Sequence, residues 1–293
     1  MKVAIYARNF DENAAVFVQQ LFHELESKSI SYFLFRDFEI FIPKFKLIVN
    51  PEGWFEDLTQ ISTLLPDCIL SLGGDGTLLD TLALVGKSGI PVLGINLGRL
   101  GFLASINKNE IVKAVADLAA QNFSVDSRTM ISINSEPNLF GDMNYALNEC
   151  TIHKRDSSPM IIVHAFLNDV FLNSYWADGL IISTPTGSTA YSLSCGGPIL
   201  FPNCHNLVIT PIGPHNLSMR PVVINDDQVL SFEIEGRSNE FLISLDSRTE
   251  IAVQGTKIKI QKENAQMNLI RLENENFLTT LRKKMMWGMD SRN

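Results

Sequence analysis

The stretch that decides the fold is Leu72-Gly73-Gly74-Asp75-Gly76-Thr77-Leu78-Leu79. It follows an apolar run that begins at Cys68 and is short enough to be a parallel strand buried on both faces. Three glycines in four positions let the backbone approach a ligand closely. A strand, a glycine turn and a helix N-terminus together present backbone N–H groups to phosphates. The stretch therefore predicts a phosphate site where a buried strand ends.

Asp75 carries the only charge in this turn. A carboxylate beside bound phosphates favours phosphoryl transfer, because a hydroxyl acceptor needs a base that backbone amides cannot supply. The alternative is structural, since glycines suit a tight turn and an aspartate beside a helix start is a good N-cap. Both interpretations are open on this stretch alone.

Composition limits the class of protein. At 293 residues, with 45% apolar and 19% charged residues, the chain is long enough for about two domains with ordinary cores. Its net charge of -8 argues against a protein that coats nucleic acid or an anionic membrane. The four cysteines are widely spaced and form no zinc pattern. The first residues resemble a strand and not a signal peptide, and no apolar run reaches the roughly 18 residues of a membrane helix. We therefore expect a cytoplasmic protein.

The first part of the chain alternates strand and helix patterns. Strands are expected at 1–7, 30–35, 68–72 and 91–95, and helices at 11–27, 54–65, 77–87 and 109–120. The short loops between them predict an α/β domain with a parallel, Rossmann-like sheet, whose ligands lie at the carboxyl ends of the strands. A second glycine-rich stretch, 96–103, falls at the same edge.

From about residue 126 the pattern changes to short alternating strands. We expect an all-β domain of many short strands, with a tight hairpin at 160–173 and a single helix at 188–195. A last strand at 267–272 and a helix at 276–286 would return to the first domain. The predicted domains are residues 1–125, completed by 265–293, and residues 126–264.

Two polar stretches stand out in the second domain. The run from Asp178 to Ile199 contains Thr184-Pro185-Thr186-Gly187-Ser188-Thr189-Ala190-Tyr191, whose hydroxyls and helix start suit a ribose, an amide or a phosphate. Capping of a short helix explains them equally well. The pair Asn148-Glu149 suits vicinal ribose hydroxyls, although a surface dipeptide is the commoner explanation.

Taken together, these stretches resemble the NAD kinases. The likeness lies in the glycine turn, in Asn148-Glu149 and above all in the run from Asp178 to Ile199, which follow one another in the family's order over nearly the whole chain. The glycine turn alone also occurs in diacylglycerol-type lipid kinases and in phosphofructokinases. The resemblance implies transfer of the terminal phosphate of ATP to the 2′-hydroxyl of the adenosine ribose of NAD, which gives NADP.

The resemblance also implies roles for individual residues, with Asp75 as the catalytic base. The phosphates would contact Gly73, Gly74, Gly76, Thr77 and Arg99. NAD would contact Gly74, Asp75, Gly76, Phe102, Asn148, Glu149, Asp178, Thr189, Ala190, Tyr191, Ser192, Leu193 and Ser194. Further candidates are Ser158, Trp176, Ser188 and Arg248.

The implied substrates are NAD and ATP, and Mg²⁺ or another divalent cation would arrive with ATP by bridging its phosphate oxygens. The protein would form a homodimer or homotetramer, because the 189–194 segment would also contact adenine from a neighbouring subunit. No nucleic-acid or membrane partner is expected.

Three positions depart from the family pattern. Asp80 stands where many members have a basic residue, Trp176 replaces a polar residue, and Arg248 stands where glutamine is common. They leave open the phosphate contacts and the choice between NAD and NADH. Two other functions stay open: a lipid kinase, for which no amphipathic basic helix or lipidation signal is visible, and an idle dinucleotide sensor, which would not need Asp75.

Overall fold

The computed structural model describes residues 1–155, 160–273 and 276–286. The chain forms two compact units. The first consists of Met1–Ser127 and Met267–Asn293, and the second of Arg128–Gln266. The chain therefore leaves the first unit once and returns to it at its end. None of the helices in the described ranges is long and apolar enough to cross a lipid bilayer.

The first unit is built on a parallel sheet with the strand order β3-β2-β1-β4-β5. Its strands are β1 (Lys2–Ala7), β2 (Ser31–Phe35), β3 (Gly53–Phe55), β4 (Cys68–Gly73), β5 (Val92–Asn96), β6 (Ile106–Asn107) and the end of β18 (Lys257–Leu272). Its helices are α1 (Glu12–Ser27), α2 (Phe38–Phe45), α3 (Leu58–Leu64), α4 (Asp75–Val85), η1 (Lys108–Glu110), α5 (Ile111–Ala119) and α7 (Phe277–Met285). The predicted α/β fold with a parallel sheet is confirmed.

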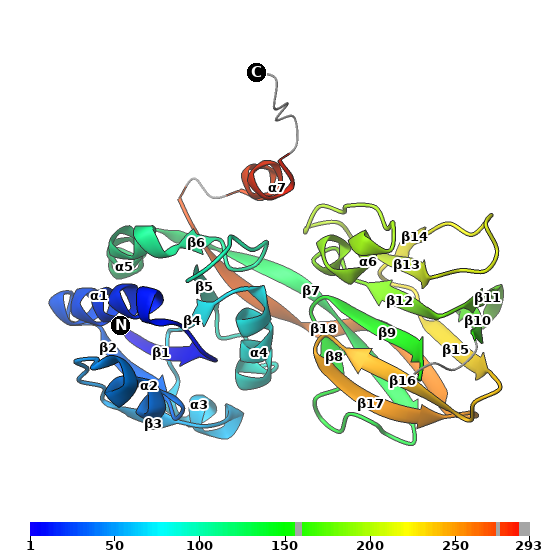
Figure 1. Ribbon diagram of the computed structural model, residues 1–293, viewed down its shortest axis with the longest axis horizontal. Helices are drawn as coiled ribbons and strands as arrows, with labels where there is room; N and C mark the ends of the chain where they lie inside the picture. Colours follow the sequence, from blue (N-terminus) through cyan, green and yellow to red (C-terminus); the bar gives the residue numbers. More distant parts are fainter. Residues whose placement is uncertain (156–159, 274–275, 287–293) are drawn as a thin grey trace. The chain divides into compact units, whose positions relative to one another are not determined.

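β4 carries the glycine turn at its carboxyl end and is buried along its whole length. Leu70 and Leu72 point into the core cluster that also contains residues of α1 and α5, which lie next to each other in Figure 1. On the other face, α4 lies close to β5, because Gly94 has no side chain there. A Cβ on Gly94 would come within 2.7 Å of the side chain of Leu78. This close approach fixes α4 and the turn before it.

Three expectations for the first unit need correction. Residues 54–65 are not one helix, because Trp54 and Phe55 pair with Leu34 and Phe35 in β3, and α3 begins after the N-cap Asp57. The strand expected at 267–272 is the end of a longer strand, β18, which begins at Lys257. The helix expected at 276–286 is α7, which spans Phe277–Met285 and has Leu281 as its buried residue. Residues 287–293 lie outside the described residues.

The second unit consists of short strands and confirms the predicted all-β domain. They are β7 (Phe123–Glu136), β8 (Tyr145–Ala146), β9 (Glu149–Lys154), β10 (Ile161–Leu167), β11 (Val170–Ala177), β12 (Gly179–Ser183), β13 (Asn206–Ile212), β14 (Val222–Asn225), β15 (Leu230–Glu235), β16 (Glu240–Leu245) and β17 (Arg248–Val253), with the first part of β18. The expected hairpin joins β10 and β11, and both turn residues, Asn168 and Asp169, have positive φ angles. The helix expected at 188–195 is two short pieces, η2 (Gly187–Thr189) and α6 (Tyr191–Ser194).

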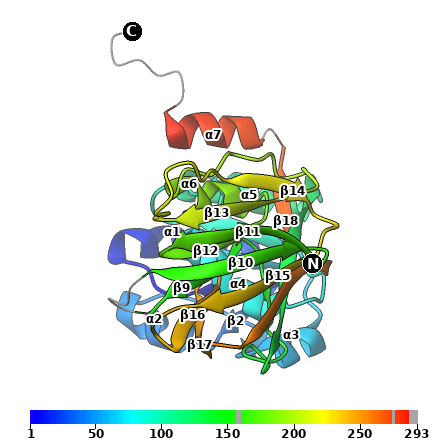
Figure 2. The same cartoon turned by 90° about the vertical axis from the view of Figure 1, so that its right-hand side faces the viewer.

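β9, which begins at Glu149, is one of the two central strands of a six-stranded sheet in this unit. The sheet has the order β14-β13-β12-β9-β16-β17, and Figure 2 shows β13, β12, β9, β16 and β17 following one another in this order. Glu149 pairs with Ser183 at the end of β12. The start of β9 therefore meets the beginning of the hydroxyl-rich stretch, and Asn148 and Glu149 lie where the regular pairing of the sheet ends.

Candidate functional site

Asp75 is the first residue of α4, but it does not cap its own helix. The N-cap is Gly74, which makes no side-chain capping bond. The Asp75 carboxylate instead accepts hydrogen bonds from the backbone N–H groups of Phe102 at 2.8 Å and of Leu103 and Ala104 at 3.0 Å each. The capping interpretation of Asp75 is therefore wrong. Asp75 ties the glycine turn to the loop after β5.

The glycines of the two loops have different roles. A Cβ on Gly101 would lie 1.8 Å from Oδ1 of Asp75, so only glycine lets the carboxylate reach this loop. A Cβ on Gly73 would lie 2.2 Å from Oγ1 of Thr77. Gly74 and Gly76 have nothing within 4 Å of the corresponding position. The open space beside Gly74 and Gly76 is what a close-approaching ligand would need.

Asn96 organises the same loop and was not predicted as a site residue. Its side-chain Nδ2 donates to the carbonyl of Arg99 at 2.6 Å, and its Oδ1 accepts from the N–H of Gly98 at 2.8 Å. Asn96 is 1% exposed, whereas Arg99 is an exposed residue. An asparagine directly after the strand expected at 91–95 is the sequence signal that could have identified it, because an amide at the end of a buried strand must find backbone partners.

α7 adds a cation that sequence reasoning also missed. Lys284 Nζ lies 3.8 Å from Oδ2 of Asp75 and 5.0 Å from the ring centroid of Phe102. The ring of Phe102 in turn lies 6.4 Å from that of Phe277. Three successive basic residues end α7, as often happens at helix C-termini, so the sequence alone gives no reason to connect one of them with Asp75.

In the second unit, the carboxylate of Asp246 accepts hydrogen bonds from three successive backbone N–H groups, as the carboxylate of Asp75 does in the first. Its carboxylate accepts hydrogen bonds from the N–H groups of Leu147 and Asn148, each at 2.8 Å, and of Glu149 at 3.2 Å. Asp246 itself has a φ of 52°, and its own N–H donates to the carbonyl of Glu149. The Asn148-Glu149 pair is therefore held by a carboxylate that was not among the predicted site residues.

Glu149 is a buried acid that lies near a second carboxylate, Asp246. It is 8% exposed, and its Oε2 makes no hydrogen bond to the described part of the chain. Burial, together with repulsion from the nearby Asp246, raises the pKa of Glu149 from 4.5 to about 8. Burial also raises the pKa of Asp246, although its three N–H partners oppose this shift. The shift favours the protonated carboxyl group, which can donate a hydrogen bond as well as accept one.

The 184–189 turn packs directly on Asn148. The N–H of Thr184 donates to the Asn148 carbonyl at 2.9 Å. A Cβ on Gly187 would lie 2.1 Å from the same oxygen. The structure therefore brings the Asn148-Glu149 pair together with the Pro/Gly turn within the second unit.

Several hydroxyls of the 178–199 run bond to the protein itself. Ser188 Oγ donates to the carbonyl of Pro185 at 2.7 Å and accepts from the N–H of Leu200, and Ser192 Oγ bonds to Oγ1 of Thr210 at 2.8 Å. Ser188 and Ser192 are fully buried. The other residues of this run that are predicted to contact NAD are half-buried or exposed. They are Thr189, Ala190, Tyr191, Leu193 and Ser194.

Two protein-family models match this chain. The ATP-NAD kinase N-terminal domain matches residues 5–123, and the ATP-NAD kinase C-terminal domain matches residues 147–272. The chain belongs to the NAD kinase family. The predicted family and enzyme class are thereby confirmed.

Individual NAD kinases are similar over the whole chain. The chain is 46% identical to the NAD kinase of Cytophaga hutchinsonii and 41% identical to that of Flavobacterium johnsoniae, each covering 100% of both chains. The yeast NADH kinase crystallised with NADH is similar in fold, with a TM-score of 0.86 and 22% identity, over 99% of this chain and 88% of that one. The Archaeoglobus fulgidus NAD kinase crystallised with ATP gives a TM-score of 0.75 and 22% identity, over 98% and 99%.

Two of the positions that depart from the NAD kinase pattern, Arg248 and Asp80, have partners within the protein. Arg248 donates to the carbonyls of Met143 and Tyr145 and lies over the Tyr145 ring. Asp80 forms an ion pair with Arg8 at 3.4 Å. Ser158 lies outside the described residues.

Asp178 and Trp176 lie on either side of the end of β11. Asp178 forms an ion pair with Lys154 at 2.6 Å, and Trp176 is 49% exposed. The roles predicted for the NAD-contacting and phosphate-contacting residues stay predictions. Among the described residues, no group of three or more His, Cys, Asp or Glu side chains could hold a metal ion.

Proposed function

We propose that this NAD kinase transfers the terminal phosphoryl group of ATP to the 2′-hydroxyl of the adenosine ribose of NAD, forming NADP and ADP, and that Asp75 accepts the hydroxyl proton. The single observation that carries the role of Asp75 is its environment. It is the acid of the glycine turn, and three N–H groups fix the orientation of its carboxylate.

The hydrogen bonds of Asp75 suggest which oxygen takes the proton. A carboxylate has about four lone-pair positions. Oδ1 accepts two N–H bonds, while Oδ2 accepts one and faces Lys284. We assign proton acceptance to Oδ2. The proton leaves the 2′-hydroxyl as its oxygen bonds to phosphorus, and the bond between that phosphorus and the bridging oxygen of ADP breaks.

The remaining predicted groups would position the substrates. Gly74 and Gly76 leave space for phosphates, and Asn148 with protonated Glu149 would hold ribose hydroxyls. Mg²⁺ or another divalent cation would enter with ATP and neutralise phosphate charge. We also propose a cytoplasmic homodimer or homotetramer in which the 189–194 segment contacts adenine in a neighbouring subunit.

The test is NADP formation from NAD, ATP and Mg²⁺ by the purified protein, with Asp75→Asn beside the wild type. The variant should lose at least about 100-fold in kcat, because a positioned base contributes about 10²- to 10⁴-fold. The side-chain NH₂ of asparagine also faces N–H donors of the loop, so the KM for NAD must be measured as a separate report on loop geometry.

The matched control is Asp57→Asn, the same substitution at the N-cap of α3, where asparagine caps as well as aspartate. It should leave kcat and KM within twofold. Retention by Asp75→Asn of more than a tenth of the wild-type kcat would contradict the assigned base. Absence of NADP formation by the wild type would contradict the function itself.

A further inference from the structure

Lys284, near the end of α7, brings a positive charge beside Asp75. Its Nζ lies 3.8 Å from Oδ2 of Asp75, the oxygen to which we assign proton acceptance. Oδ2 accepts a single N–H bond, from Phe102, whereas Oδ1 accepts two. The ammonium group therefore lies next to the oxygen that would meet the 2′-hydroxyl.

Phe102 contacts both members of this ion pair. Lys284 Nζ lies 5.0 Å from the centroid of the Phe102 ring, within the range of a cation–π interaction. The backbone N–H of Phe102 donates to Oδ2 of Asp75 at 2.8 Å. The side chains of Lys284 and Asp75 are 34% and 30% exposed. The two charges are thus held by the same residue and are partly shielded from water.

A purely structural role accounts poorly for the contact between Lys284 and Asp75. At 3.8 Å the two groups are farther apart than in a hydrogen bond, and Lys284 forms no hydrogen bond with any residue that the structure describes. Partly exposed ion pairs of this kind stabilise a fold little. The buried residue of α7 is Leu281, one turn earlier. The three N–H donors of the ammonium group are therefore available to a ligand.

A cation at this position would assist phosphoryl transfer. The carboxylate of Asp75 and the phosphoryl group of ATP are both anionic, so they repel each other when the 2′-hydroxyl lies between them. In the transition state the transferred group spreads its negative charge over three oxygens. The glycine turn contains no basic residue from Gly73 to Thr77. A fixed ammonium group beside the base would compensate this charge where it develops.

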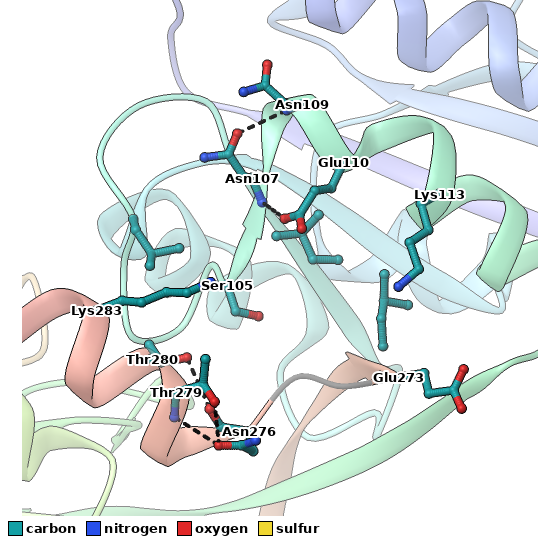
Figure 3. Close-up of a pocket in the computed structure, with 13 residues that line it drawn as sticks. Ser105, Asn107, Asn109, Glu110, Lys113, Glu273, Asn276, Thr279, Thr280 and Lys283 are labelled. Atoms are coloured by element: carbon teal, nitrogen blue, oxygen red, sulfur yellow. Dashed lines mark hydrogen bonds between the residues drawn. The ribbon is translucent and has the colours of Figure 1, made fainter.

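The neighbouring lysine of α7 faces another part of the first unit. Figure 3 shows Lys283 extending toward Ser105 in a cavity of about 510 Å³, which Thr279 and Thr280 also line. Successive residues of a helix point in directions about 100° apart, so adjacent lysines do not share one contact. The helix therefore directs Lys284 to Asp75 and offers Lys283 as a matched position for a control.

We propose that Lys284 is a catalytic residue of this NAD kinase, whose ammonium group contacts the transferred phosphoryl group and stabilises its charge in the transition state. The hydroxyl proton goes to Oδ2 of Asp75 as the 2′-oxygen bonds to phosphorus. The bond from phosphorus to the bridging oxygen of ADP breaks, and Lys284 keeps its proton throughout. The inference rests on the proposed NAD kinase activity and adds a residue of α7 to its mechanism.

Lys284→Met in the full-length protein tests the proposal, because methionine keeps an unbranched side chain against Phe102 and removes the charge. The variant should lose about 100-fold or more in kcat, since a group aimed at developing charge contributes about 10²- to 10³-fold. The KM values for NAD and for ATP should each stay within threefold, because the interaction strengthens in the transition state. Lys284→Arg keeps the charge and should retain at least ten times the kcat of Lys284→Met.

Binding measurements separate this role from an effect on folding. Calorimetry with ADP and aluminium fluoride, in the presence of NAD and Mg²⁺, reports affinity for a mimic of the phosphoryl group in transfer. Lys284→Met should weaken this binding about tenfold or more. The affinity for AMP-PNP, which resembles bound ATP, should stay within threefold. Equal weakening of both would mean that Lys284 contacts the bound donor, and would overturn the proposal.

The matched control is Lys283→Met, the same substitution one residue earlier on α7. It should leave kcat within twofold, and thermal melts should show that all variants are folded. An undiminished kcat in Lys284→Met, or an equal loss in Lys283→Met, would overturn the role of Lys284 and leave the NAD kinase function intact. Absence of NADP formation by the wild type would overturn both.

Discussion

Glu149→Gln is expected to remove a pH dependence from the stability of the second unit. Glu149 has an ordinary pKa of 4.5 and a pKa of about 8 in the folded protein. Between these values the folded chain keeps the proton and the unfolded chain releases it. Stability is therefore lost as the pH rises through this window, by about 1.4 kcal/mol per pH unit. Glutamine has the same shape and does not titrate.

The loss expected for the wild type between pH 5 and pH 7.5 is about 3 kcal/mol from this carboxyl group alone. Equilibrium urea unfolding at half-unit pH steps measures it. The Glu149→Gln curve should lie above the wild-type curve by an amount that grows with pH across the window. Asp246, whose pKa is also raised by burial, remains in both proteins, so the difference between the two curves reports the titration of Glu149 together with its repulsion from Asp246.

Glu250→Gln is the matched control, because Glu250 is exposed in the same unit. It should follow the wild-type profile. Parallel pH profiles for the wild type and Glu149→Gln would refute the reasoning, since they would mean that Glu149 binds protons equally well in the folded and unfolded chains.

Two glycine substitutions test the close contacts that hold the site. Gly101→Ala would place a Cβ 1.8 Å from Oδ1 of Asp75. The variant should therefore lose about 1–3 kcal/mol of unfolding free energy, measured by urea unfolding, and should have a lower kcat. Unchanged stability and kcat would show that the loop is not held as described. Gly187→Ala would place a Cβ 2.1 Å from the carbonyl oxygen of Asn148. A similar loss of unfolding free energy is expected, together with a higher KM for NAD. An unchanged midpoint of urea unfolding would count against this packing.

Local patterns in the sequence were enough for much of the fold. The buried run before Gly73, the alternation of strand and helix patterns and the change at about residue 126 predicted a parallel α/β unit and an all-β unit, because the periodicity of side chains reflects which faces are buried. The same patterns failed for residues 54–65, where pairing of Trp54 and Phe55 with β2 overrode a weak helical pattern.

The glycines, acids and hydroxyl-bearing residues of the candidate site were also visible in the sequence, and the family resemblance assigned roles to them. The structure added what holds them. Asp75 bonds to N–H groups up to 29 residues away, and Asp246 bonds to N–H groups up to 99 residues away. Asn96 bonds to the backbone of the loop that Asp75 holds, and Gly101 leaves room for the Asp75 carboxylate beside it. No local sequence pattern specifies that loop.

The kind of fold and the kind of residues at its strand ends can be predicted from the chain alone, because both follow from short-range periodicity and side-chain chemistry. The folded structure was needed to show that Asp75 holds a loop and does not cap its helix, that burial beside Asp246 raises the pKa of Glu149, and that Lys284 faces Asp75. These properties depend on burial and on contacts between distant segments, and such contacts exist only after the chain has closed the long loops between them.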